Sequence, residues 1–155
     1  MIEIRKAKIS DAKEIFKLER EWKKENISWG IFLPKTRQNE IVKEIKKQVW
    51  YVAEENNQII GYIQGEIIKS SGIRPAFGIK KGEKYGELHS VYISKKFRGK
   101  KIGNLLIERL FEDFKYQKIK TIKLKAVSKN VWSLVKYYKK FGFEERLVDM
   151  VLKQK

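Results

Sequence analysis

The residues best suited to do chemistry form a basic, glycine-containing stretch near the middle of the chain, Phe97–Leu106. It contains Arg98, Lys100 and Lys101, and it joins the apolar, β-branched run Leu88–Ile93 to a segment whose apolar residues recur at helical spacing. The first amides of a helix have no intrahelical acceptor and carry the positive end of the helix dipole. A cationic junction of strand and helix therefore predicts a phosphate-binding site. The alternative is a tight connection whose glycines relieve strain and whose lysines are solvated.

Two motifs in this region resemble one known family. The run Arg98-Gly99-Lys100-Lys101-Ile102-Gly103 resembles the acetyl-coenzyme A signature of the GNAT N-acetyltransferase superfamily, Arg/Gln-x-x-Gly-x-Gly/Ala. The stretch Tyr138–Phe143 resembles the Tyr-x-x-x-Gly-Phe sequence that ends the last helix of that family. The resemblance, which runs from Glu87 to Phe143, implies an acetyl-CoA site whose loop amides hold the coenzyme pyrophosphate. It assigns coenzyme binding to Val91, Tyr92, Ile93, Arg98, Gly99, Lys100, Lys101, Ile102, Gly103, Asn104 and Asn130.

Two of these positions depart from the family pattern. Lys101 stands where glycine is usual, and a Cβ there hinders a positive φ. Either Lys101 keeps a negative φ with its side chain turned outward, or the coenzyme sits differently. Counting back from Gly142, the family's asparagine is expected at Val131, whereas Asn130 comes one residue earlier.

The reaction implied by the resemblance needs a proton acceptor and a proton donor. An amine that attacks a thioester is mostly protonated at neutral pH, so a group must take its proton. Glu87 matches the position of the glutamate base in several family members; the alternative is a salt bridge in a lysine-rich protein. Tyr138 matches the acid that protonates the leaving thiolate; the alternative is a core tyrosine, and Tyr137 is its neighbour. The amides of the central strand would polarise the thioester carbonyl and pair with the pantetheine arm.

The acceptor side is less defined by the sequence. His89 is two residues from Glu87 and on the same face of the strand. It lines the acceptor pocket, relays protons or is a structural histidine, and we favour the last. Four aromatic residues form either the acceptor pocket or part of the core: Trp22, Trp29, Phe32 and Phe77.

Composition excludes several classes of protein. The 155 residues predict one domain, residues 1–155, with one core. The chain has no cysteine, so disulfides, a cysteine nucleophile and cysteine-based zinc sites are excluded, and a single histidine excludes multi-histidine metal sites. We therefore expect no metal. There is no signal peptide and no run of membrane length, which predicts a cytoplasmic protein without a membrane partner.

The formal net charge is +17. Such a charge attracts anions, including nucleotide cofactors, nucleic acid, ribosomal components and acidic proteins. The alternative is a compositional bias of the source genome, since acidic residues are interspersed and no basic tail stands apart.

Periodicity and turn residues predict the elements that position the site. The chain begins with a strand at residues 2–8, a helix capped by Ser10 or Asp11, a connection at 26–35 and a helix from near Thr36. A hairpin follows, with strands at 49–54 and 58–69 and a turn at Asn56-Asn57, and Gly61 and Gly65 suggest a bulge or a close backbone approach. Residues 70–86 are either a functional loop or an extension of the hairpin. The central strand and helix are followed by a strand at 121–127, a helix from Asn130 to Gly142 and a last strand at 143–152.

These elements predict an α/β fold with a mixed, mostly antiparallel central sheet flanked by about four helices, as in the GNAT arrangement. The leading hypothesis is an acetyl-CoA-dependent N-acetyltransferase that moves an acetyl group directly to a primary amine in a ternary complex. The acceptor would be a protein N-terminus or lysine, a ribosomal component among them, or a small amine. The alternatives are a basic nucleic-acid-binding module and a GNAT-like coenzyme-binding protein without catalysis. The acceptor, the acyl chain length and a homodimeric state stay open.

Overall fold

The computed structural model describes residues 1–27, 37–127 and 130–148. Its strands are β1 (Ile2–Lys6), β2 (Val49–Glu55), β3 (Gln58–Lys69), β4 (Lys84–Ile93) and β5 (Ile122–Leu124). Its helices are α1 (Ala12–Ile27), α2 (Gln38–Lys47), α3 (Ile102–Tyr116) and α4 (Val131–Lys139). None of the helices in these ranges is long and apolar enough to cross a membrane.

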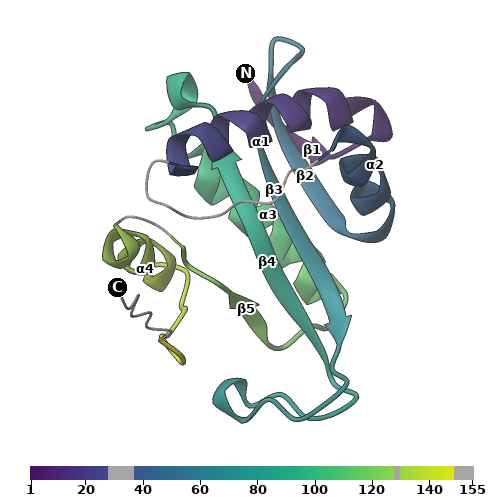
Figure 1. Cartoon of the computed structure of the whole chain (residues 1–155), viewed down its shortest axis with the longest axis vertical. Helices are drawn as coiled ribbons and strands as arrows, with labels where there is room; N and C mark the ends of the chain where they lie inside the picture. Colours follow the sequence, from purple (N-terminus) through teal and green to yellow (C-terminus); the bar gives the residue numbers. More distant parts are fainter. Residues whose placement is uncertain (28–36, 128–129, 149–155) are drawn as a thin grey trace, which may run out of the picture.

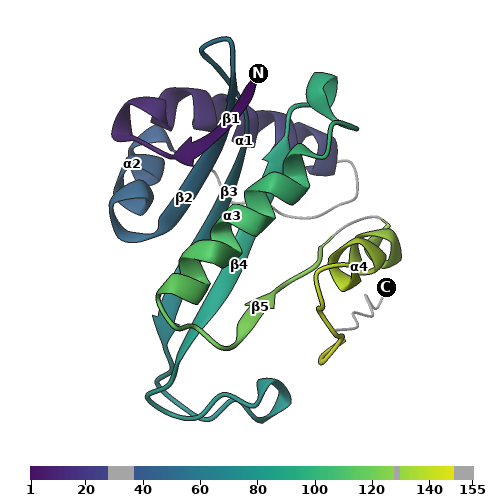
Figure 2. The same cartoon turned by 180° about the vertical axis from the view of Figure 1, so that it is seen from behind.

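The strands form one sheet in the order β1-β2-β3-β4-β5, antiparallel except for the parallel pair β4 and β5. Helices α1 and α2 cover one face of this sheet (Figure 1). Helix α3 lies across the other face, and α4 is set apart beyond β5 (Figure 2). The predicted fold class, a mixed and mostly antiparallel sheet with four flanking helices, is confirmed.

Glycines on two neighbouring strands let α3 approach the sheet closely. A Cβ on Gly65 would lie 2.9 Å from Cζ of Phe114, and one on Gly86 would lie 2.6 Å from its Cε2. Phe114 is fully buried there. The β2–β3 register also shifts beside Gly61, where Ile60 is an extra residue on β3, so both predicted roles of the β3 glycines, bulge and close approach, are realised.

The turns follow the sequence signals. Asn56 and Asn57 have φ of 51° and 61°, the left-handed values that a tight hairpin turn requires. Residues 70–83 extend the β3–β4 hairpin, because the Ser70 amide bonds to the Glu83 carbonyl and Arg74 pairs with Ile79 around the short turn at Pro75–Phe77. Of the two alternatives for this stretch, the extended hairpin is therefore correct.

Three predicted boundaries were wrong. The strand predicted at 121–127 is only the three residues of β5, because β4 and β5 pair only from Gly86 to Leu88. No strand forms at 143–148, where Arg146 pairs with Glu144 and Lys139 with Glu145 in place of a ladder; residues 149–152 lie outside the described ranges. The first strand, predicted at 2–8, ends at Lys6. Helix α1 begins at Ala12, directly after Asp11 as predicted, and the Asp11 carboxylate accepts from the Lys8 amide in the preceding 3-10 turn, Ile9–Asp11.

The predicted connection at 26–35 and the start of α2 fall largely outside the described residues. Trp29, Phe32 and Thr36 are among those that the structure does not describe.

Candidate functional site

The site begins at an edge of β4 that β5 leaves uncovered. Beyond Leu88, which pairs with Leu124, β4 has no partner on that side among the described residues. The Ser94 amide bonds to the Ile60 carbonyl, and hydrogen-bonded pairs alternate along an antiparallel ladder. The backbone N–H and C=O groups of Tyr92 are therefore directed toward β3. The amides of Val91 and Ile93 are directed toward the open edge.

A tight turn carries the chain from β4 into α3. Gly99 and Lys101 have φ of 84° and 60°, and Lys101 is the residue before the helix. The carbonyl of Lys101 accepts from the amides of Asn104 and Leu105. The amides from Gly99 to Gly103 donate to no backbone carbonyl in the described part of the chain. Together with the helix dipole, they form a backbone site for an anion.

A pocket of about 380 Å³ opens at this turn. It is lined by the end of β4, the turn, the start of α3 and the last turn of α4: Ile93, Phe97, Arg98, Gly99, Lys101, Ile102, Gly103, Asn104, Tyr137 and Lys140. Seven of the residues predicted to bind the coenzyme are in this lining. Lys100 is not, because its ammonium lies 3.8 Å from the Glu55 carboxylate and above the Phe97 ring. Val91 and Tyr92 are also outside it, and Val91 reaches the site only through its backbone.

Arg98 is held beside the pocket by the protein itself. Its guanidinium donates to the Glu25 carboxylate at 2.8 Å and to the Ile93 carbonyl at 2.9 Å, and it lies above the Tyr92 ring. Burial alone would raise the pKa of Glu25, but the hydrogen bonds from Arg98 and Tyr92 outweigh it and lower that pKa. Arg98 thus joins the end of α1 to the turn that precedes α3.

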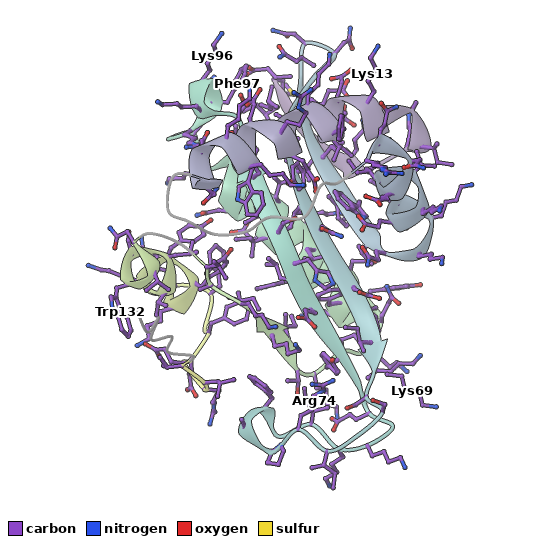
Figure 3. The ribbon with its side chains drawn as sticks, in the orientation of Figure 1. Lys13, Lys69, Arg74, Lys96, Phe97 and Trp132 are labelled. Atoms are coloured by element: carbon purple, nitrogen blue, oxygen red, sulfur yellow. The ribbon has the colours of Figure 1, made fainter. Side chains whose placement is uncertain are left out.

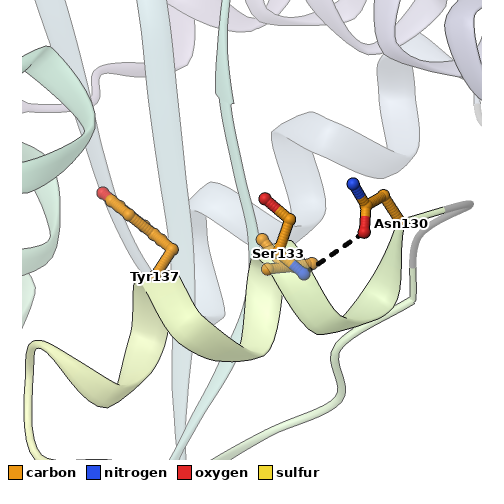
Figure 4. A pocket seen from close by; sticks show the side chains of 4 residues that line it. Asn130, Ser133 and Tyr137 are labelled. Carbon is orange, nitrogen blue, oxygen red and sulfur yellow. Dashed lines mark hydrogen bonds between the residues drawn. The ribbon is translucent and has the colours of Figure 1, made fainter.

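Helix α4 closes the pocket from the far side. Asn130 begins the helix as predicted, because its side-chain oxygen accepts from the Ser133 amide at 3.4 Å. A second, smaller pocket of about 230 Å³ lies along α4 and is lined by Asn130, Ser133, Leu134 and Tyr137 (Figure 4). Asn130 is therefore near the predicted coenzyme site but lines this neighbouring pocket.

The two tyrosines of α4 have different surroundings. The Tyr137 hydroxyl donates to Oδ1 of Asn104 at 2.9 Å and lies 3.1 Å from where a Cβ of Gly103 would be. Tyr138 is 6% exposed, belongs to the core cluster of Leu88 and Leu106, and makes no hydrogen bond through its hydroxyl to another described residue. Burial, with a smaller contribution from Tyr137, raises the pKa of Tyr138 to about 12. Its hydroxyl therefore stays protonated at neutral pH.

Glu87 lies on the face of β4 opposite α3. Its carboxylate is 2.8 Å from the ammonium of Lys123 on β5, and both side chains are 14% exposed. The lysine also lies near the rings of Tyr85 and Phe77. The structure thus places Glu87 in an ion pair between the two parallel strands.

A model of the acetyltransferase (GNAT) family matches residues 12–143, which is most of the chain and includes every residue of the pocket. The chain belongs to the GNAT acetyltransferase family.

Solved structures share this fold. A tetramutant of the BH1408 protein from Bacillus halodurans superposes with a TM-score of 0.82 at 18% identity, over 98% of this chain and 99% of that one. A predicted acetyltransferase from Clostridium acetobutylicum with acetyl-CoA has a TM-score of 0.71 at 25% identity, over 100% and 96% of the two chains. A ribosomal-protein-alanine N-acetyltransferase from Brucella melitensis has a TM-score of 0.68 at 15% identity, over the whole of both chains. A comparison with curated proteins found no match.

GNAT enzymes take the acetyl group from acetyl-CoA, and the residues of this site fit that molecule. The unpaired amides from Gly99 to Gly103, with Lys101 and Lys140 beside them, suit a pyrophosphate. The open edge of β4 offers amides and carbonyls to an arm that itself contains amides.

Sequence reasoning missed three residues of the GNAT pocket, Phe97, Tyr137 and Lys140. Tyr137 and Lys140 are three residues apart and so lie on one face of α4, which was a usable signal. Phe97 belongs to the short turn Lys95–Phe97, whose position depends on how β4 ends.

The left-handed conformation of Lys101 excludes the first of the two alternatives, a negative φ, and leads to a prediction. Because a Cβ strains this conformation by about 1 kcal/mol, Lys101→Gly should stabilise the protein by about 0.5–1 kcal/mol in urea unfolding. It should also weaken acetyl-CoA binding at low salt, since one cation is lost from the pocket. Lys100→Gly is the matched control: its φ is not positive, so glycine should destabilise the protein. Equal effects of the two variants would contradict a strained Lys101.

Proposed function

We propose that this GNAT protein is a single-domain N-acetyltransferase that moves the acetyl group of acetyl-CoA directly to a primary amine. The observation that carries the proposal is the continuity of two features: the open edge of β4 at Val91 and Ile93 leads straight into the amide-rich turn before α3. One feature suits an amide-containing arm and the other a pyrophosphate, so the acetyl group would lie near the point where β4 and β5 separate. The chain has no cysteine to carry the acetyl group, which favours direct transfer.

The two faces of β4 carry the candidate groups for the two proton transfers of the reaction. Tyr138, on the α3 side, carries a protonated hydroxyl and is our candidate for stabilising the leaving thiolate. The proton of the amine must go to a group on the opposite face, which carries Glu87, the residue predicted from the sequence, and His89. The Val91 amide is the candidate donor to the thioester carbonyl.

The acceptor is an amine of a protein, a ribosomal component or a small molecule. The similarity in fold to a ribosomal-protein-alanine N-acetyltransferase makes a peptide N-terminus a reasonable first substrate to try. The positive charge does not favour nucleic acid in particular, because labelled cationic side chains lie at opposite ends of the molecule: Lys96 at one, Lys69 and Arg74 at the other (Figure 3).

Thermal unfolding and thiol release test this proposal together. Acetyl-CoA at about one hundred times its Kd should stabilise the protein by about 2.7 kcal/mol, which raises Tm by about 5–10 °C in a domain of this size. Release of CoA thiol should then depend on an added amine, tried as a peptide beginning with alanine, a peptide with an internal lysine, an aminoglycoside and a polyamine. Because the chain has no cysteine, every thiol detected comes from the coenzyme.

Two outcomes would overturn the proposal. One is a Tm that acetyl-CoA does not change, together with no amine-dependent thiol release. The other is stabilisation only by a short DNA duplex that added salt abolishes, which would indicate a nucleic-acid-binding protein.

A further inference from the structure

A row of hydrogen-bonded polar side chains crosses the sheet on the face opposite α3. Glu66 on β3 lies 3.0 Å from Nε2 of His89 on β4, and its carboxylate also accepts from Gln48 at 3.1 Å. Gln48 in turn accepts from Gln64 at 2.7 Å. The row continues on both sides of Gln64: Ser90 donates to its side-chain oxygen, and its side-chain amide donates to Glu44. None of these residues lines the coenzyme pocket.

A bulge in β4 brings this row to the proposed reaction point. Gln64 pairs with Ser90 but Gly65 pairs with Leu88, so His89 is an extra residue on β4. The extra residue of a bulge re-aims its side chain, and here the imidazole meets Glu66 on the α1 and α2 side of the sheet. His89 is also the first residue of β4 beyond the last pair with β5, and it is two residues from Val91, whose amide is directed toward the open edge. His89 therefore lies at the point where β4 no longer pairs with β5.

The ion pair of Glu87 makes that residue a poor proton acceptor. If its carboxylate took a proton, the ammonium of Lys123 would be left without its partner at a site where both side chains are mostly buried. Breaking one half of such a pair is costly because the other charge stays desolvated. His89 carries no such penalty, because its ring is 31% exposed and its partner is a carboxylate.

We propose that His89 accepts the proton of the acceptor amine and that Glu66 positions the ring for this step. The inference rests on the proposed N-acetyltransferase function. An ionised carboxylate can only accept, so the neutral ring donates from Nε2 to Glu66 and leaves Nδ1 to take a proton. Imidazole exchanges protons near neutral pH and is the usual side chain for such a transfer.

The step balances with one proton to His89 and one to the leaving sulfur. The ammonium of the acceptor gives a proton to Nδ1 of His89, and the freed nitrogen lone pair forms the C–N bond with the acetyl carbon. The C–S bond breaks and its electron pair leaves with the sulfur. Tyr138 protonates that thiolate, and the second amine proton restores the tyrosine hydroxyl. His89 then releases its proton to water. Glu66 touches neither reactant and acts only through the ring.

Two carboxylates from neighbouring elements act on the imidazole. Besides Glu66 on β3, Glu44 on α2 acts on His89 electrostatically, and Glu19 on α1 acts on Glu44. Burial, with repulsion from neighbouring glutamates, raises the pKa of Glu44. On β4 itself Glu87 is on the same face and is balanced by Lys123. The two groups that act on the ring directly are thus carboxylates, and the step creates a cation beside them.

Kinetics of three variants test the proposal, with the amine of the panel that wild type acetylates fastest. His89→Gln should lower kcat about a hundredfold and change KM for that amine little. Glu66→Gln should lower kcat about tenfold, because an amide holds the ring but stabilises its charge less. Glu112→Gln, an exposed glutamate on α3, is the matched control and should leave kcat unchanged.

Nuclear magnetic resonance adds a readout that a merely structural histidine would not give. His89 is the only histidine, so its ring signals need no assignment by mutation. With CoA bound, the neutral ring should carry its proton on Nε2, and its titration should coincide with the acidic limb of the kcat profile. That limb should be absent in His89→Gln.

Two results would overturn the proposal while leaving the proposed function intact. They are a neutral ring protonated on Nδ1 and a His89→Gln variant within threefold of wild-type kcat. Loss of the proposed function is distinguishable, because wild type would then release no thiol with any amine of the panel.

Discussion

Replacing Tyr138 by phenylalanine should lower kcat about a hundredfold while acetyl-CoA affinity changes less than twofold. The substitution removes only the hydroxyl, which makes no hydrogen bond to another described residue, so neither the pocket nor the fold loses a contact. Because burial holds the pKa at about 12, the wild-type hydroxyl carries its proton throughout the neutral range and can donate to the leaving sulfur. Steady-state kinetics with thiol detection give kcat, and thermal shifts at graded acetyl-CoA give the affinity.

Tyr137→Phe is the matched control for this prediction. It removes the bond from the Tyr137 hydroxyl to Asn104, which joins α4 to the first turn of α3 in the coenzyme pocket. We therefore expect weaker acetyl-CoA binding and a loss of about 1 kcal/mol of stability, with a smaller effect on kcat than in Tyr138→Phe. If Tyr137→Phe abolished turnover and Tyr138→Phe left it unchanged, the acid would be the residue that faces the pocket, and the assignment from the sequence would be wrong.

The parts of the fold that sequence could predict depend on local signals. Asn56 and Asn57 take left-handed conformations, Asn130 begins α4, and Gly142 follows that helix with φ of 88°, all as their residue types indicate. The turn at residues 98–103 was recognisable for the same reason, since its glycines and cations are consecutive. Seven of the predicted coenzyme residues consequently line one pocket.

What the sequence could not predict depends on the register between distant strands. The bulge at His89 shifts every later pairing of β3 with β4 by one residue, and nothing in residues 84–93 alone indicates it. The pairing of β4 with β5 decides that Glu87 meets Lys123, so the structure has the ion pair that was the alternative to a free base. Consecutive residues of a helix are rotated by about 100°, so the rotation of α4 about its axis decides which of two adjacent tyrosines faces the pocket.

The contact between α3 and the sheet should dominate stability. Phe114→Ala should cost about 3–5 kcal/mol in urea unfolding, because the ring is fully buried between α3 and the glycines of β3 and β4. Gly86→Ala should cost about 1–3 kcal/mol, since its Cβ would lie 2.6 Å from that ring and neither strand nor helix can yield freely. Gly72→Ala is the matched control: nothing lies within 4 Å of its Cβ, and we expect a change within about 0.5 kcal/mol.

A double variant shows whether the clash itself is the cause. In Gly86→Ala with Phe114→Leu, the smaller leucine side chain makes room for the new methyl group. The double variant should therefore lose less free energy of unfolding than Gly86→Ala and Phe114→Leu lose in sum when measured singly. Strict additivity would mean that Gly86 acts through backbone freedom and not through contact with Phe114. The contact bears on function because the same helix begins at the coenzyme turn and the same strand carries His89 and the Val91 amide. Variants that loosen the contact of Phe114 with Gly86 should therefore weaken acetyl-CoA binding as well. A destabilised protein with unchanged affinity would show that the site is held from the other face of the sheet, where Arg98 contacts Glu25.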